Sequence, residues 1–182
     1  IVKEMAKLGF FGCLAPEKYG GNETGYLAAS VMTEEIARIS PSWGLPFNLQ
    51  MNSIQSVLLA FGTEEQRQRW IPKLINADLL GCFAITEPNT GSDVASMKSK
   101  AVETEGDFVL NGTKMWISGV PVADLGIVYV YTDKAAKHRG MSAFIVDMHA
   151  PGVTQKSIDS KLGLFCAPTG EIVFADVKLP KD

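Results

Sequence analysis

The spacing of hydrophobic positions changes along the chain near residue 78, from the period of a helix to that of a strand. In the N-terminal part, apolar side chains recur three to five residues apart, as Leu27, Val31 and Ile36 do. That spacing places them on one face of a helix. Helices are therefore predicted over residues 1–8, 24–39, 47–61 and 63–75.

Residues at the ends of these segments agree with the helix prediction. Thr63 and Gln66 stand three positions apart before an apolar run, the pattern of a capping box. Pro41 is expected to end the second helix. Pro72 is expected to kink or split the last one, because proline has no N–H and clashes with the preceding turn.

After residue 78, short runs rich in β-branched and aromatic residues predict strands. The predicted strands cover residues 80–86, 98–103, 108–110, 114–118, 126–132, 142–148 and 170–179. Asn111-Gly112 is a strong hairpin signal, so a hairpin turn is predicted there, with another turn at Glu105-Gly106-Asp107. Strands separated by such turns favour an antiparallel barrel or sandwich.

The order of the elements predicts an α+β fold with two domains, because helices and strands occur in separate blocks rather than in alternation. An all-helical domain is expected over residues 1–79 and an antiparallel β domain over residues 80–182. The chain starts without Met inside a predicted helix and stops just after a predicted strand. We therefore expect it to be a segment of a longer protein.

Composition narrows the class of protein. Of 182 residues, 46% are hydrophobic and 20% are charged, which is too apolar for a disordered chain. The net charge is −3 and the longest basic cluster is Lys137-His138-Arg139, so nucleic acid is not an expected partner. No apolar run approaches the roughly 18 residues of a membrane span, so none is predicted.

The cysteines bear on metal binding and on location in the cell. Cys13, Cys82 and Cys166 form neither a CxxC motif nor a cluster with histidine. No metal site is predicted from them. Reduced thiols are expected instead, in the cytoplasm or, in a eukaryote, the mitochondrial matrix.

Residues 83–93, Phe-Ala-Ile-Thr-Glu-Pro-Asn-Thr-Gly-Ser-Asp, are the segment most able to carry chemistry. They follow a predicted strand, and they can present the hydroxyls of Thr86 and Ser92 together with free backbone N–H groups. Such groups suit a phosphate or the polar edge of a ring. Spacing alone supports equally well an ordinary turn capped by Asp93.

Residues 114–119, Lys-Met-Trp-Ile-Ser-Gly, form the second candidate segment. Trp116 with a hydroxyl two positions later at Ser118 could pack on a planar cofactor and hydrogen-bond to it, although spacing alone favours core packing for Trp116. His138 and His149 lie in polar stretches and are predicted to be surface residues. A histidine-based catalytic triad is therefore not expected.

Together the two segments resemble the paired signatures of the acyl-CoA dehydrogenase family. Residues 83–93 match aromatic-x-[IV]-T-E-P-x-x-G-S-D, and residues 114–119 match K-x-W-I-[TS]-[NG]. Similar matches occur at residues 62–72 and 161–163, in the same order and at the same spacing. Gly81-Cys82-Phe83 and residues 121–125 are closest to the glutaryl-CoA dehydrogenase-like branch.

This resemblance implies a protein of three domains, of which the chain holds the N-terminal helical and middle β domains without the C-terminal helical bundle. It implies non-covalent FAD, α,β-desaturation of an acyl-CoA substrate, an electron-transferring flavoprotein as acceptor, and a homotetramer or homodimer. The residues that it places at FAD are Phe83, Ile85, Thr86, Gly91, Ser92, Trp116, Ile117 and Ser118, with Ser92 also near the acyl-CoA. In most of the family the catalytic base is a Glu of the C-terminal domain, so none is assigned in this chain, neither to Glu87 nor to Asp93.

The resemblance also bears on the acyl group. Glutaryl-CoA dehydrogenases bind the distal carboxylate with an Arg at a position that corresponds to about Gly44, and no Arg lies between Ile39 and Phe61. A neutral acyl group, straight, branched or alicyclic, is therefore expected. The apolar residues Leu49, Met51 and Ile54 could line its pocket, with core packing favoured.

Two other functions stay open. One is an acyl-CoA oxidase or flavin monooxygenase on the same scaffold. The other is a truncated family member that binds without catalysis.

Overall fold

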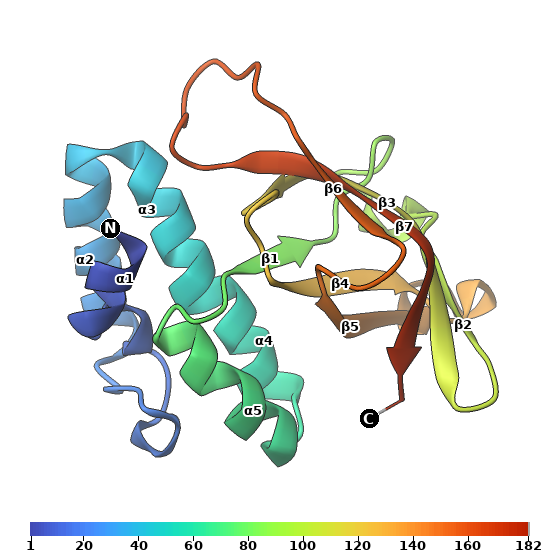
Figure 1. The fold of residues 1–182 in the computed structure, drawn as a ribbon, viewed down its shortest axis with the longest axis horizontal. Helices are drawn as coiled ribbons and strands as arrows, with labels where there is room; N and C mark the ends of the chain where they lie inside the picture. The colour runs from blue at the N-terminus through green and yellow to red at the C-terminus, as the bar shows by residue number, and fades with distance from the viewer. Residues whose placement is uncertain (182) are drawn as a thin grey trace. The chain divides into compact units, whose positions relative to one another are not determined.

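The computed structural model describes residues 1–181, and the chain divides into two compact units. The first comprises Ile1–Gly81 and Lys161–Ala167, and the second comprises Cys82–Ser160 and the segment from Pro168 onward. Figure 1 shows the elements of each unit. The division into domains at residues 79 and 80 stays a prediction of the sequence.

Helices build the first unit, as the apolar spacing predicts. Its elements are α1 (Val2–Lys7), η1 (Phe10–Gly12), η2 (Glu17–Tyr19), α2 (Gly25–Ile39), α3 (Pro41–Asn48), the π-helical segment η3 (Leu49–Ser53), α4 (Ile54–Phe61) and α5 (Glu64–Ile75). None of the helices in the part of the chain that the structure describes is long and apolar enough to cross a membrane.

Two prolines differ in effect from a simple helix-breaker. Pro41 follows the end of α2 but also opens α3 at its first turn, where its missing N–H costs nothing. The helical path therefore begins earlier than the predicted residue 47. Pro72 lies inside α5, which is continuous from Glu64 to Ile75, so the helix is not split there.

The capping box is present as predicted at the start of α5. The Thr63 backbone N–H donates to Gln66 Oε1 over 3.0 Å, and the Gln66 backbone N–H donates to Thr63 Oγ1 over 3.2 Å. Two otherwise unpaired N–H groups at the helix start are thereby satisfied.

Aromatic and sulfur-containing side chains form the core of the helical unit. The rings of Phe11 and Phe47 lie 5.7 Å apart between centroids, and Phe10 packs edge-on against Phe47. Met51 belongs to the same buried cluster and Ile54 is fully buried, so both pack in the core. Their side chains are therefore occupied by the fold itself.

A buried glutamine in the π-helical segment holds the chain that leads out of α5. Gln50 Nε2 donates to the carbonyls of Leu74 and Leu79, over 2.9 and 2.8 Å, and Gln50 Oε1 accepts from the Gly81 N–H over 3.0 Å. A π-helical turn changes the direction in which side chains leave a helix. Here it places an amide against the backbone groups of the segment that joins α5 to β1.

A curled mixed sheet builds the second unit. Its strands are β1 (Gly81–Ala84), β2 (Lys100–Glu103), β3 (Asp107–Ser118), β4 (Leu125–Tyr131), β5 (Met141–Asp147), β6 (Val153–Ser157) and β7 (Thr169–Pro180). Their order is β1-β4-β2-β3-β7-β6, with β5 on β4. The pairs β2–β3, β3–β7, β4–β5 and β6–β7 are antiparallel, whereas β2 meets β4 in parallel at Lys100 and Tyr131.

The hairpin predicted at Asn111-Gly112 is wrong. β3 runs through these residues without a turn, and its register against β7 shifts between Leu110 and Gly112. Asn111 instead exchanges two hydrogen bonds with Asp176 of β7, over 2.9 and 3.0 Å. The pair Asn-Gly thus lies opposite a β-bulge whose extra residue belongs to β7, where Asp176 has a left-handed φ of +52°.

Close packing explains the glycine in that bulge. Gly112 has φ +150°, and a Cβ atom built there would lie 2.2 Å from Ser99 Oγ. The hairpin between β2 and β3 lies instead at the other predicted turn, around Gly106. β6, with the sequence Val-Thr-Gln-Lys-Ser, was not predicted, because it lacks the apolar alternation of the other strands.

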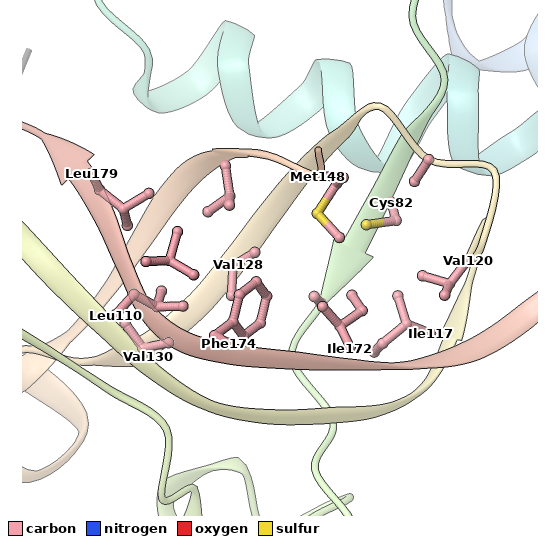
Figure 2. Packing of buried hydrophobic residues seen from close by; sticks show 14 of the residues in the cluster. Cys82, Leu110, Ile117, Val120, Val128, Val130, Met148, Ile172, Phe174 and Leu179 are labelled. Carbon is pink, nitrogen blue, oxygen red and sulfur yellow. The ribbon is translucent and has the colours of Figure 1, made fainter. Parts of the chain in front are cut away.

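The concave side of the sheet encloses an apolar core. Figure 2 shows side chains from several strands pointing into one interior, among them Leu110 of β3, Val128 of β4 and Phe174 of β7. All three are at most 2% exposed. β3 and β7, the two long neighbouring strands in Figure 1, supply much of this core.

Phe174→Ala should remove about 3–5 kcal/mol from the free energy of unfolding, because it deletes a fully buried ring and leaves a cavity. Urea unfolding of the complete protein, followed by circular dichroism, measures the loss. Val173→Ala is the control, since Val173 is the neighbouring residue in β7 and is 36% exposed. Equal losses in both variants would contradict the assignment of Phe174 to the core.

Candidate functional site

A buried lysine joins the two candidate segments of the sequence. Lys114 lies in β3 with its side chain 0% exposed. Its ammonium group donates to the Ile85 carbonyl over 3.1 Å and to Glu87 Oε1 over 2.9 Å. Residues 83–93 and 114–119, separate in the sequence, therefore meet in the β unit.

The carboxylate of Glu87 is fully engaged. Besides Lys114 Nζ, its Oε1 accepts from the Ser99 N–H over 2.9 Å, and its Oε2 accepts from the Lys98 N–H over 2.6 Å. Glu87 and Thr90 also exchange two backbone hydrogen bonds, over 2.9 and 3.1 Å. The loop that follows β1 is therefore a hydrogen-bonded turn, and the Glu87 carboxylate attaches it to residues 98, 99 and 114.

Opposing effects act on the ionisation of this pair. Burial raises the pKa of Glu87, but hydrogen bonds from the backbone N–H groups of Lys98 and Ser99 and from Lys114 outweigh it, so the pKa lies below 4.5. Burial lowers the pKa of Lys114 from 10.5, against the attraction of the Glu87 carboxylate. A buried charge of either sign is stable only beside its partner.

Trp116 projects from the second bulge, whose extra residue lies in β3. The register between β3 and β7 shifts between Lys114 and Ile117, and Trp116 adopts a left-handed backbone with φ +61°. Its side chain is 59% exposed, so the core packing that spacing favours is wrong for this residue. The extra residue of the bulge turns the indole outward and returns Ile117 to the core, where it is 3% exposed.

Thr86 is hydrogen-bonded to a residue of this bulge. Its carbonyl accepts from the backbone N–H of Met115 over 2.9 Å. Thr86 and Ser118 are both half-buried, so each retains a surface. Thr86 is thus hydrogen-bonded to the residue before Trp116, and Ser118 follows Trp116 by two positions in β3.

The other residues predicted to bind the cofactor differ in their surroundings. Phe83 in β1 packs its ring against Tyr129 of β4, with 5.1 Å between centroids, and Ile85 is half-buried. Gly91 and Ser92 are exposed at the far end of the loop, and a Cβ atom on Gly91 would meet nothing within 4 Å. The side chain of Ile117, in contrast, belongs to the core rather than to this surface.

Lys114 and Glu87 were not predicted from the sequence as residues that organise the site. A lysine inside a predicted strand, four positions after the buried Leu110, is a weak signal of a buried charge. Nothing in the spacing identifies Glu87 as its partner, because the two are 27 positions apart.

Other reactive groups lie outside this arrangement. His138 and His149 are exposed, as predicted, and His149 Nε2 lies 3.0 Å from Asp124 Oδ1. Burial raises the pKa of the Cys82 thiol to about 12, so this cysteine is not a nucleophile at neutral pH.

Comparison with known proteins identifies the family. Residues 1–78 match the model of the acyl-CoA dehydrogenase N-terminal domain, and residues 82–177 match that of the acyl-CoA dehydrogenase middle domain. The chain therefore belongs to the acyl-CoA dehydrogenase family, and its helical part followed by a β part is the expected order.

Individual relatives agree with this assignment. The chain is 44% identical to a glutaryl-CoA dehydrogenase of Desulfococcus multivorans over 100% of its own length and 47% of the relative. It is 43% identical to the mitochondrial isovaleryl-CoA dehydrogenase of Pongo abelii, over 98% of the chain and 43% of the relative. A solved glutaryl-coenzyme A dehydrogenase in complex with glutaryl-CoA matches with a TM-score of 0.95 and 44% identity, over 99% of the chain and 46% of that structure. The chain thus spans about half the length of the relatives that it matches.

Glu87→Gln should destabilise the protein at pH 7 by about 3–5 kcal/mol, because it leaves the Lys114 ammonium buried without a carboxylate. The pKa of Glu87 is below 4.5 in the folded state, so the stability that its charge contributes is present above pH 4.5 and is lost as the pH falls further. The gap between the wild type and the variant should therefore narrow below pH 4.5, as measured by urea unfolding at several pH values.

Glu103→Gln is the matched control. Glu103 pairs with Lys181 over 2.6 Å at the surface, and its side chain is 65% exposed. Its loss should change stability by less than about 1 kcal/mol. Similar losses in both variants at pH 7 would contradict a special contribution of the buried pair.

Proposed function

We propose that the protein containing this chain is an FAD-dependent acyl-CoA dehydrogenase, which removes hydrogen from the α- and β-carbons of an acyl-CoA thioester. The observation that carries the proposal is the contact between the two signature segments, where Lys114 and Met115 hold Ile85, Thr86 and Glu87 beside the exposed indole of Trp116. Family membership supports the same conclusion.

The residues present fit a flavin. A large aromatic side chain that is 59% exposed beside two hydroxyl-bearing residues offers a flat apolar surface with a polar edge. At the end of the same loop, Gly91 leaves open space where a Cβ atom would be, so a phosphate could approach the backbone closely. A solved acyl-CoA dehydrogenase of Bacillus anthracis is described as complexed with FAD.

Each residue has a definite part in this proposal. Trp116 packs against the ring system, and Phe83 and Ile85 line it. Thr86 and Ser118 donate hydrogen bonds to its polar edge, which would favour the reduced ring. Gly91 and Ser92 hold the pyrophosphate, and Ser92 also contacts the acyl-CoA. FAD, when bound, supplies the acceptor for the hydride that leaves the β-carbon.

This chain supplies no catalytic base in the proposal. Glu87 is 6% exposed and both of its carboxylate oxygens already accept hydrogen bonds, so it is not available to an α-proton. Asp93 accepts a hydrogen bond from the Ser96 hydroxyl. The base is expected in the part of the relatives that the chain does not span.

Helix packing supports a neutral acyl group. Gly44 in α3 is buried, and a Cβ atom there would lie 2.9 Å from the Cβ atom of Ala37 in α2. The two helices approach too closely at this point for a longer side chain without displacement. A cation that would bind a distal carboxylate at position 44 is thus disfavoured by size as well as absent from the sequence.

The remaining parts of the proposal concern the complete protein. We propose an electron-transferring flavoprotein as acceptor, a homotetramer or homodimer, and a cytoplasmic or mitochondrial-matrix location. A structure described as the electron-transferring flavoprotein of Acidaminococcus fermentans is among the structural neighbours, and related eukaryotic enzymes are described as mitochondrial. Domain boundaries at residues 79 and 80 belong to the same proposal.

The complete protein should be yellow when purified, with the visible absorbance of oxidised FAD. This absorbance should decrease when a suitable acyl-CoA is added without oxygen. Absorbance spectroscopy in a sealed cuvette tests this, with free CoA as control. A colourless protein that cannot be reconstituted with FAD would refute the proposal. Oxygen consumption coupled to turnover would instead indicate an oxidase or monooxygenase, and flavin that binds but is never reduced would indicate a non-catalytic member.

Neutral acyl-CoA thioesters should reduce the flavin more effectively than glutaryl-CoA does, because position 44 offers no cation to the distal carboxylate. Losing one charged contact costs about 1.5–3 kcal/mol, so kcat/KM should fall at least about tenfold for glutaryl-CoA. Butyryl-, isovaleryl- and cyclohexanecarboxyl-CoA are the comparison substrates. A glutaryl-CoA rate equal to the best of them would contradict the specificity and leave the reaction class intact.

A further inference from the structure

We propose that Lys114 is a positioning residue for the flavin site: through the Ile85 carbonyl and the Glu87 carboxylate it fixes Thr86 and the segment from Trp116 to Ser118 in the arrangement that binds the cofactor and sets its properties. This inference rests on the proposed function. It assigns to Lys114 no contact with substrate or flavin.

The contacts of Lys114 lie on both sides of Thr86 in the sequence. Ile85 and Glu87 are the immediate neighbours of Thr86, and one ammonium group holds both, over 3.1 and 2.9 Å. Thr86 itself is held through its carbonyl by the N–H of Met115. Three consecutive residues of the loop are therefore attached to two consecutive residues of β3.

Lys114 also lies directly before the bulge of β3 that contains Trp116. Its backbone is the last regular pairing with β7, opposite Ile172, before the bulge that turns Trp116 outward. The bulge leaves Trp116 with φ +61°, a conformation that persists only where neighbouring contacts determine it. Anchoring the residue two positions earlier supplies such a contact.

Burying the charges of Lys114 and Glu87 costs free energy, and this cost points to a role beyond packing. A buried ion pair is an inefficient source of stability, since apolar side chains of similar volume often serve as well or better. A lysine with 0% exposure opposite a carboxylate with 6% exposure therefore needs another explanation than packing. Directional hydrogen bonds to one carbonyl and one carboxylate fix orientation, which an apolar contact does not.

The alternative is that the pair has only a structural role in the β unit. Loss of stability and loss of flavin properties must then go together in every destabilised variant. Leu110→Ala provides the comparison, because Leu110 lies in the same strand, is 0% exposed, and packs in the core away from the two signature segments in the sequence. It is expected to lower stability without altering the signature segments.

The experiment compares Lys114→Met and Leu110→Ala in the complete protein. FAD dissociation constants, the visible spectrum of bound flavin, and the midpoint potential without substrate are measured beside urea unfolding. Lys114→Met should raise the dissociation constant at least about tenfold, the size of effect that loss of a supporting residue has at metal sites, and should shift both spectrum and potential. Leu110→Ala should leave all three unchanged despite its lower stability.

A double variant separates charge from placement. Lys114→Met combined with Glu87→Gln leaves no unpaired buried charge, so it should recover stability relative to Lys114→Met, while FAD affinity stays low. This variant also carries the test where Lys114→Met does not fold.

Wild-type flavin affinity, spectrum and potential in Lys114→Met or the double variant would overturn the inference and leave the proposed function standing. The inference would also be overturned if Leu110→Ala changed flavin affinity, spectrum and potential as much as Lys114→Met does. A wild-type protein that binds no flavin would overturn both together.

Discussion

The buried ion pair between Lys114 and Glu87 is the interaction on which the signature segments depend. Neither side chain could remain charged in this place alone, because each would lose its hydration without compensation. Their partners are also not interchangeable: the lysine reaches a backbone carbonyl as well as the carboxylate, and the glutamate receives two backbone N–H groups. A small number of polar contacts thus determines where a whole loop lies against β3.

Two features of β3 have complementary effects. Gly112, which has no Cβ atom, lets Ser99 approach the strand, and Ser99 supplies a backbone N–H to Glu87. The bulge after Lys114 turns Trp116 to the surface while Ile117 stays in the core. One feature therefore allows the carboxylate to be satisfied, and the other presents an aromatic ring.

Much of the fold follows from the sequence, and the exceptions have local causes. The helices, the Thr63 capping box and most strands are visible in apolar spacing and end signals, because each depends on neighbours in the sequence. Asn111-Gly112 misleads, because its glycine is required by the close approach of Ser99 and its asparagine pairs with Asp176 of β7, and neither contact can be read from spacing. Trp116 misleads for a related reason, since one inserted residue reverses the face of the sheet that a side chain occupies. The loop and the Trp116 segment were identifiable as motifs, but their link through Lys114 depends on a contact that spacing cannot reveal.

The close approach of α2 and α3 at Gly44 and Ala37 limits how this protein could evolve. A longer side chain at position 44 first requires the two helices to separate or the residue at position 37 to shrink. A variant that changed position 44 alone would therefore lose helix packing before it gained any new contact. The order of substitutions is thus constrained, because the helix spacing or position 37 has to change first.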